Sequence, residues 1–138
     1  MAGHSYRDLD VWQKAMDLVV VCYKLAQQFP ENEKYGLINQ IQRAAVSIPA
    51  NIVEGQARQY VKEFIQHLSI AQGSFAEVET YVLLVERLGY VNHDKAHEIL
   101  DKTDQVARMI AGLQKSLKKP KTNNQQQATK NSFVSENK

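Results

Sequence analysis

Apolar residues recur at steps of three and four along most of this 138-residue chain, which is the spacing of one face of an α-helix. The pattern is clearest between residues 60 and 88, where a heptad repeat runs through Phe64, Leu68, Ala71, Phe75, Val78, Val82 and Val85. A second apolar row widens this face and consists of Ile70, Tyr81, Leu84 and Leu88. We therefore expect this helix to contact more than one neighbour.

Three further amphipathic segments predict helices near residues 7–29, 33–54 and 92–119. We expect Pro30 to end the first helix and Asn92 to cap the start of the last. Gly55 and Gly89 are the predicted ends of the second and third helices. No segment alternates with period two for long enough to make a sheet, and the connections span about three to six residues.

These elements predict an all-α fold, an antiparallel up-down-up-down four-helix bundle over residues 1–119. Residues 120–138 are polar and hold almost nothing that a core would bury, so we expect a disordered tail. The length is that of one domain, and an apolar share of 43% is ordinary for a globular protein.

The second predicted helix carries a proline near its middle. Pro49 donates no N–H, and its ring crowds the carbonyl of Ala45, which costs about 3 kcal/mol inside a helix. Ser47 and Asn51 flank the proline with short polar side chains that can bond the freed backbone groups. We therefore predict a kink at Pro49.

A polar stripe adjoins the apolar face of the same helix, because Arg43, Ser47, Asn51 and Glu54 are spaced by four, four and three. Two interpretations stay open. The stripe fixes the kink and bridges to another helix, with Glu77 or Glu79 as partners of Arg43, or it is a row that faces a ligand.

Gly73 and Ser74 lie on the third predicted helix, where small residues let two helices approach closely. We expect a packing role for this pair, because Ser74 has no neighbouring histidine in the sequence. The complete set of predicted structural residues is Arg43, Ser47, Pro49, Asn51, Glu54, Gly55, Gly73 and Glu77.

Several classes of protein are disfavoured by what the sequence lacks. It has no glycine-rich phosphate loop, no Gly-x-Ser-x-Gly and no Cys-x-x-Cys, so we predict neither an enzyme nor a cofactor. His93 and His97 are four apart, which is half of a metal site, but only Asp94 and Glu98 are near them in sequence. We interpret the two histidines as solvated surface residues and predict no metal.

The single cysteine, Cys22, lies in an apolar run and is expected to be a buried, inert thiol. There is no N-terminal apolar segment of the signal-peptide kind, and no apolar run approaches 18 residues. We therefore expect a soluble cytoplasmic protein with no membrane contact.

Charge is unevenly distributed along the chain. Residues 1–114 hold 11 Lys or Arg and 14 Asp or Glu, a net charge of −3, whereas residues 115–138 hold six Lys and one Glu, a net charge of +5. The predicted nucleic-acid contacts are Arg58, Lys62, Lys115, Lys118, Lys119 and Lys121. The alternative is that lysines at the end of a helix only complement its dipole. Without interleaved aromatic side chains, these cations would hold a phosphate backbone and would not read bases.

Two segments carry a resemblance to a known family. Residues 40–55 read QIQRAAVSIPANIVEG, and residues 70–77 read IAQGSFAE. Together with residues 9–15, 29–35 and 88–90, they closely resemble the bacterial four-helix bundle family of 23S ribosomal RNA intervening-sequence proteins, over about residues 6–117. The resemblance implies a bundle that assembles as a ring-like homopentamer and has no catalytic residues.

A related branch of that family is the accessory protein of diversity-generating retroelements, which binds a reverse transcriptase and nucleic acid through a positively charged surface. We therefore predict a non-enzymatic homo-oligomer, most simply a pentamer, that binds RNA, another nucleic acid or a nucleic-acid-processing protein through basic surface patches. The acidic body of this chain departs from that pattern. The alternative is a protein–protein interaction scaffold with no nucleic-acid role.

Overall fold

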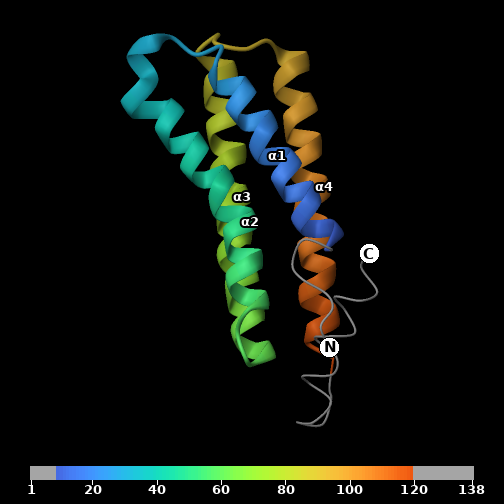
Figure 1. Ribbon diagram of the computed structural model, residues 1–138. Helices are drawn as coiled ribbons and strands as arrows, with labels where there is room; N and C mark the ends of the chain where they lie inside the picture. Colours follow the sequence, from blue (N-terminus) through green and yellow to red (C-terminus); the bar gives the residue numbers. More distant parts are fainter. Residues whose placement is uncertain (1–8, 120–138) are drawn as a thin grey trace.

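The computed structural model describes residues 9–119, which form four long helices and contain no strand. The helices are α1 (Asp10–Ala26), α2 (Asn39–Gln56), α3 (Val61–Arg87) and α4 (His93–Leu117), and they lie alongside one another (Figure 1). The predicted all-α class is confirmed, while the predicted tail at 120–138 lies outside the described residues. None of the helices within residues 9–119 is both long and apolar enough to cross a membrane.

One apolar core lies between the four helices. Contacts join α1 to α2, α2 to α3, α3 to α4, and α4 back to α1, so every helix has two neighbours. All seven residues of the predicted α3 heptad are buried. Full burial of a large apolar side chain contributes about 1.5–3 kcal/mol, so this seam is a main source of stability.

The second apolar row of α3 behaves differently from the heptad. Ile70, Leu84 and Leu88 keep 50%, 40% and 49% of their surface exposed, and only Tyr81 is half-buried. The width of the apolar face is therefore not explained by contacts within one chain.

Side-chain hydrogen bonds fix the relative direction of α3 and α4. Gln72 Nε2 donates to the carbonyl of Ala107 at 3.2 Å, and Gln114 Nε2 donates to Ser69 Oγ at 3.1 Å. From the first bond to the second, the residue number rises from 107 to 114 on α4 and falls from 72 to 69 on α3. These two helices are therefore antiparallel. The full up-down-up-down order stays a prediction from the short connections.

The turn between α3 and α4 follows the sequence signals. Gly89 has φ 79°, a left-handed conformation that favours glycine. Tyr90 N–H donates to the Val85 carbonyl at 2.9 Å and Gly89 N–H donates to Glu86 at 3.0 Å, which together form a Schellman motif. Asn92 Oδ1 then accepts from Lys95 N–H at 2.8 Å. The predicted helix stop at Gly89 and the N-cap at Asn92 are both confirmed.

The start of α2 differs from the prediction. The chain first makes a 3-10 turn, η2 (Glu31–Glu33), then a π-helical turn, η3 (Lys34–Ile38), and only then α2. Gly36 interrupts the helical geometry with φ −109° and ψ −107°. Gly36 has no Cβ and so tolerates this non-helical backbone, which the spacing of apolar side chains does not report.

Gly55 lies inside α2, which continues to Gln56, so its predicted role as the helix cap is wrong. A Cβ atom at this position would lie 2.7 Å from Phe64 Cδ1 and 2.8 Å from His67 Cβ. Glycine is needed here because α3 packs directly on the last turns of α2.

Gly73 shows the opposite behaviour, since a Cβ atom there would meet nothing within 4 Å. The predicted close approach at Gly73 is therefore wrong, and its neighbour Ser74 is the buried member of the pair.

Cys22 is completely buried among the core side chains. Burial raises the pKa of its thiol to about 12, so almost no thiolate is present at neutral pH. This supports the prediction of an inert structural cysteine.

We predict that Gly55→Ala lowers the free energy of unfolding by about 1–3 kcal/mol, because the new methyl group must displace Phe64 or His67. Gly73→Ala and Gly112→Ala are the controls. Both glycines lie within helices in open space, so alanine there should stabilise by about 0.5–1 kcal/mol. Urea unfolding of the three variants measures the difference. A Gly55→Ala variant as stable as the controls would contradict the close contact.

Candidate functional site

Four polar side chains join α2 to α3 around Pro49. Ser74 Oγ lies 2.8 Å from Ser47 Oγ and donates to it. Asn51 Nδ2 donates to the Ser47 carbonyl at 2.8 Å and lies 3.1 Å from Ser47 Oγ, and Asn51 Oδ1 lies 3.0 Å from His67 Nδ1. Ser47 pairs with Ser74 and Asn51 pairs with His67, so a step forward along α2 is matched by a step back along α3. The two helices are therefore antiparallel. We call Ser47, Asn51, His67 and Ser74 the polar chain.

The orientation of Asn51 fixes the proton position on His67. The amide nitrogen of Asn51 faces two acceptors on Ser47, so its oxygen must face His67 and accept a hydrogen bond there. His67 Nδ1 therefore carries a hydrogen. Glu54 Oε2 lies 3.7 Å from the same nitrogen and is the only charged group in this contact.

The polar chain does not form an activated serine. The partners of Ser74 Oγ are Ser47 Oγ and the Ile70 carbonyl, at 2.8 and 3.3 Å, and neither is a base. Ser47 and Asn51 bond each other and α3 on either side of the buried Pro49. The kink itself stays a prediction.

Arg43, the first residue of the predicted stripe, does not join the polar chain. It is exposed, and among the described residues it forms no ion pair with Glu77 or Glu79, so the predicted partners are wrong. Arg43 and Ser47 instead line a hollow of about 380 Å³ between α1 and α2, with Tyr23, Asn39, Gln42 and Val46. The stripe thus faces solvent at its start and bridges to α3 at its end.

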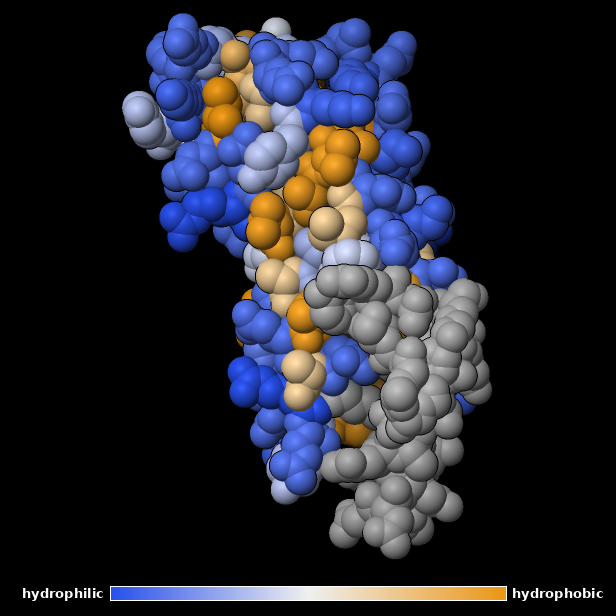
Figure 2. Space-filling view, viewed as in Figure 1, coloured by the Kyte–Doolittle hydropathy of each residue, from blue (hydrophilic) through white to orange (hydrophobic). Residues whose placement is uncertain are grey.

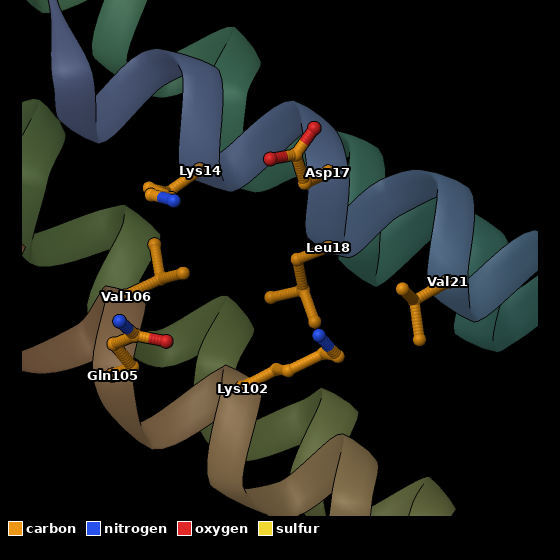
Figure 3. A pocket seen from close by; sticks show the side chains of 7 residues that line it. All are labelled: Lys14, Asp17, Leu18, Val21, Lys102, Gln105 and Val106. Atoms are coloured by element: carbon orange, nitrogen blue, oxygen red, sulfur yellow. The ribbon is translucent and has the colours of Figure 1, made fainter.

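A second, smaller hollow lies between α1 and α4 (Figure 3). It measures about 90 Å³ and is lined by Lys14, Asp17, Leu18, Val21, Lys102, Gln105 and Val106. Sites for small molecules usually measure roughly 300–1,000 Å³. This hollow is too small for such a ligand.

The predicted basic residues gather at one end of the bundle. Because α3 and α4 are antiparallel, the last turn of α4 lies level with the first turn of α3, and both segments are at the lower end in Figure 1. The cations here are all exposed and are Arg58, Lys62, Lys115, Lys118 and Lys119. We call these five residues the basic end. Lys121 lies outside the described residues.

The two segments that carry the basic end contain few carboxylates. Residues 54–67 and 109–119 contain two acidic side chains, Glu54 and Glu63, against the five cations. Arg108, just beyond, is already paired with Asp104 at 2.6 Å. With five cations and two carboxylates, these two segments carry a net charge of +3, although residues 1–114 are net acidic.

An aromatic side chain also belongs to this end. Tyr60 lies between Arg58 and Lys62 in sequence and is 56% exposed. The interpretation that the basic residues have no aromatic neighbour is therefore wrong. Tyr60 is the residue that precedes α3, and its exposure follows from that turn position rather than from any apolar spacing.

The opposite end of the bundle brings together a group that the sequence analysis missed. Glu86, in the last turn of α3, has its Oε2 atom 2.7 Å from His93 Nδ1, and the rings of His93 and His97 have centroids 3.9 Å apart. The sequence feature that could have revealed this group is Gly89, because the turn there reverses the chain and places the end of α3 beside the start of α4.

Comparison with known proteins gives a consistent result. A family model described as 23S rRNA-intervening sequence protein matches residues 7–112. A crystal structure of a protein of unknown function from the S23 ribosomal protein family of Bacteroides thetaiotaomicron VPI-5482 is similar, with 25% identity and a TM-score of 0.71. The match covers 76% of this chain and 98% of that one. No curated protein matches.

We predict that Asn51→Ala lowers the free energy of unfolding by about 1–3 kcal/mol, because it removes partners from Ser47 and His67 in a partly buried contact. A double-mutant cycle with His67→Ala should give a coupling energy of about 0.5–3 kcal/mol. Thr80→Ala is the control, since that exposed hydroxyl bonds only the Ala76 carbonyl of its own helix, and it should change stability by less than about 0.5 kcal/mol. Additive effects of the Asn51 and His67 substitutions would show that their contact contributes nothing.

Proposed function

We propose that this chain, which belongs to the 23S rRNA-intervening sequence protein family, is a non-enzymatic homo-oligomer that binds structured RNA, or a complex containing it, through the basic end. The observation that carries the proposal is the meeting of five exposed cations from two distant segments at one end of an otherwise acidic bundle. Neither the family description nor that of the solved relative names an enzymatic activity.

The chemistry of the basic end suits a phosphate backbone. Lysine and arginine gain affinity from nucleic acid largely by releasing its condensed counterions, without regard to sequence. Tyr60 adds an exposed ring between Arg58 and Lys62, on which an unpaired base can stack, and such stacking is worth roughly 1–3 kcal/mol per base. RNA with a loop or a bulge beside a helix offers both partners.

The exposed apolar surface supports assembly of several copies. One group of such residues lies on α1 and α2, where Figure 2 shows an apolar band, and comprises Met16, Val20, Tyr23 and Val46. A second group lies on α3 and comprises Ile70, Leu84 and Leu88. Exposed apolar patches of this kind mark interaction surfaces.

Two different patches on one chain suit a heterologous contact, in which the patch of one copy meets the other patch of the next and the assembly closes as a ring. We propose a ring-like homopentamer of this kind. The basic end then appears five times, and avidity offsets the small number of cations in each copy.

The second candidate function is a protein-interaction scaffold, which the same exposed apolar residues favour. In that case the patches receive another protein, and the basic end has no ligand. A pull-down with and without nuclease separates the two functions, because partners recruited through RNA are lost on digestion and partners docked directly remain.

We predict that the protein binds a hairpin RNA with an affinity that falls steeply as salt rises. Changing Lys115, Lys118 and Lys119 to Gln should reduce the slope of log K against log salt by about 3 per engaged subunit and weaken binding at least about tenfold, because each lysine releases about one counterion. Fluorescence anisotropy at a series of salt concentrations measures both quantities.

The matched control changes Lys34, Arg87 and Lys95 to Gln, since these exposed or partly exposed cations lie away from the basic end. This control variant loses the same amount of charge. Its affinity for the hairpin RNA and its slope of log K against log salt should stay nearly unchanged. Equal losses in the two triple variants would show that only net charge matters, and binding that does not respond to salt would contradict the proposal.

We predict a solution mass near five times the chain mass of 15.7 kDa, measured by light scattering after size exclusion. Val20→Glu together with Val46→Glu places two charges in the first patch and should yield a monomer with unchanged helix content. Leu83→Glu is the control, because that residue is 46% exposed but belongs to neither patch. Wild-type protein that is monomeric at micromolar concentration would refute the ring.

A further inference from the structure

We propose that Glu86, His93 and His97 form a binding site for a zinc-type divalent transition-metal ion at the turn between α3 and α4. This site lies at the opposite end of the bundle from the basic end and does not depend on RNA binding. Two imidazoles and one carboxylate are the ligand types that zinc takes from proteins in sites with one open position.

The three side chains already converge in the structure. One ligand atom from each lies within 4.8 Å of the other two, and Glu86 Oε2 is 2.7 Å from His93 Nδ1. In a tetrahedral zinc site with bonds of about 2.0–2.2 Å, the ligand atoms are about 3.3–3.6 Å apart. The Glu86–His93 pair is closer than this, and the widest spacing in the cluster exceeds it by at most about 1.5 Å; rotation of the two exposed rings can correct both.

The backbone that carries the ligands is fixed independently of any metal. Glu86 is held because its carbonyl accepts from Gly89 N–H in the Schellman motif. His93 and His97 begin α4 one turn apart on the same face, behind the Asn92 cap. Binding therefore needs little ordering of the chain, and the main cost is removal of the Glu86–His93 hydrogen bond.

The environment allows the ion to enter and keeps one position free. Glu86 is half-buried, while both histidines are exposed, so the open side of the cluster faces solvent. Three protein ligands leave the fourth tetrahedral position to water. Zinc suits this set better than Mg²⁺ or Ca²⁺, which prefer oxygen ligands alone.

The test uses the full-length untagged chain after removal of metal by a chelator, with ZnCl₂ as the probe in a competition titration against a chromophoric chelator. Wild-type protein should bind one zinc ion per chain. His97→Ala and Glu86→Gln should each weaken binding at least about 100-fold, because changes even beyond the first ligands cost about 10–100-fold. Asp94→Asn, an acidic neighbour on the same turn of α4 but outside the cluster, should bind zinc as wild type does.

Two further measurements keep the result independent of folding. Far-UV circular dichroism without metal should show the same helix content in all four proteins, since neither His97 nor the charge of Glu86 supports the core. Zinc should raise the Tm of wild type and of Asp94→Asn, but not that of His97→Ala. The inference is overturned if wild type binds no zinc, if His97→Ala binds within threefold of wild type, or if Asp94→Asn loses as much affinity as the ligand variants.

Discussion

The contact between α2 and α3 is the constraint on which the rest of the bundle depends. Gly55 lets the last turns of α2 lie directly against Phe64 and His67, and the polar chain joins the same two helices on either side of Pro49. A partly buried polar contact of this kind is most stable when each member finds its partner, so it favours one register between the helices. The end of α2 and the start of α3 then lie at one end of the bundle, where Arg58, Tyr60 and Lys62 are exposed.

With α2 and α3 held together in this way, different surfaces of the bundle carry different chemical groups. Hydrogen bonds from Gln72 and Gln114 hold α4 antiparallel to α3, which brings the lysines at the end of α4 to the same end as the turn after α2. The opposite end carries Glu86 and the two histidines, and the exposed apolar residues lie along the sides.

The sequence predicts the features that depend on local spacing or local chemistry. The α3 heptad identifies the core, because burial follows the same period as the helix, and Gly89 and Asn92 identify their turn, because each acts on its own backbone. Which residues meet a particular neighbouring helix could not be predicted. Gly55 and Gly73 look alike in sequence, yet only Gly55 has a helix against it. Glu86 meets His93 for the same reason, since only the finished turn brings them together.

The most direct test of the account is a map of lysine reactivity, made by limited acetylation of the protein with and without a hairpin RNA and read by mass spectrometry. RNA bound at the basic end should protect Lys62, Lys115, Lys118 and Lys119, while Lys14, Lys24, Lys34 and Lys95 react as before. Protection at Lys34 and Lys95, or equal protection along the whole chain, would contradict the proposal that the basic end is an RNA-binding surface.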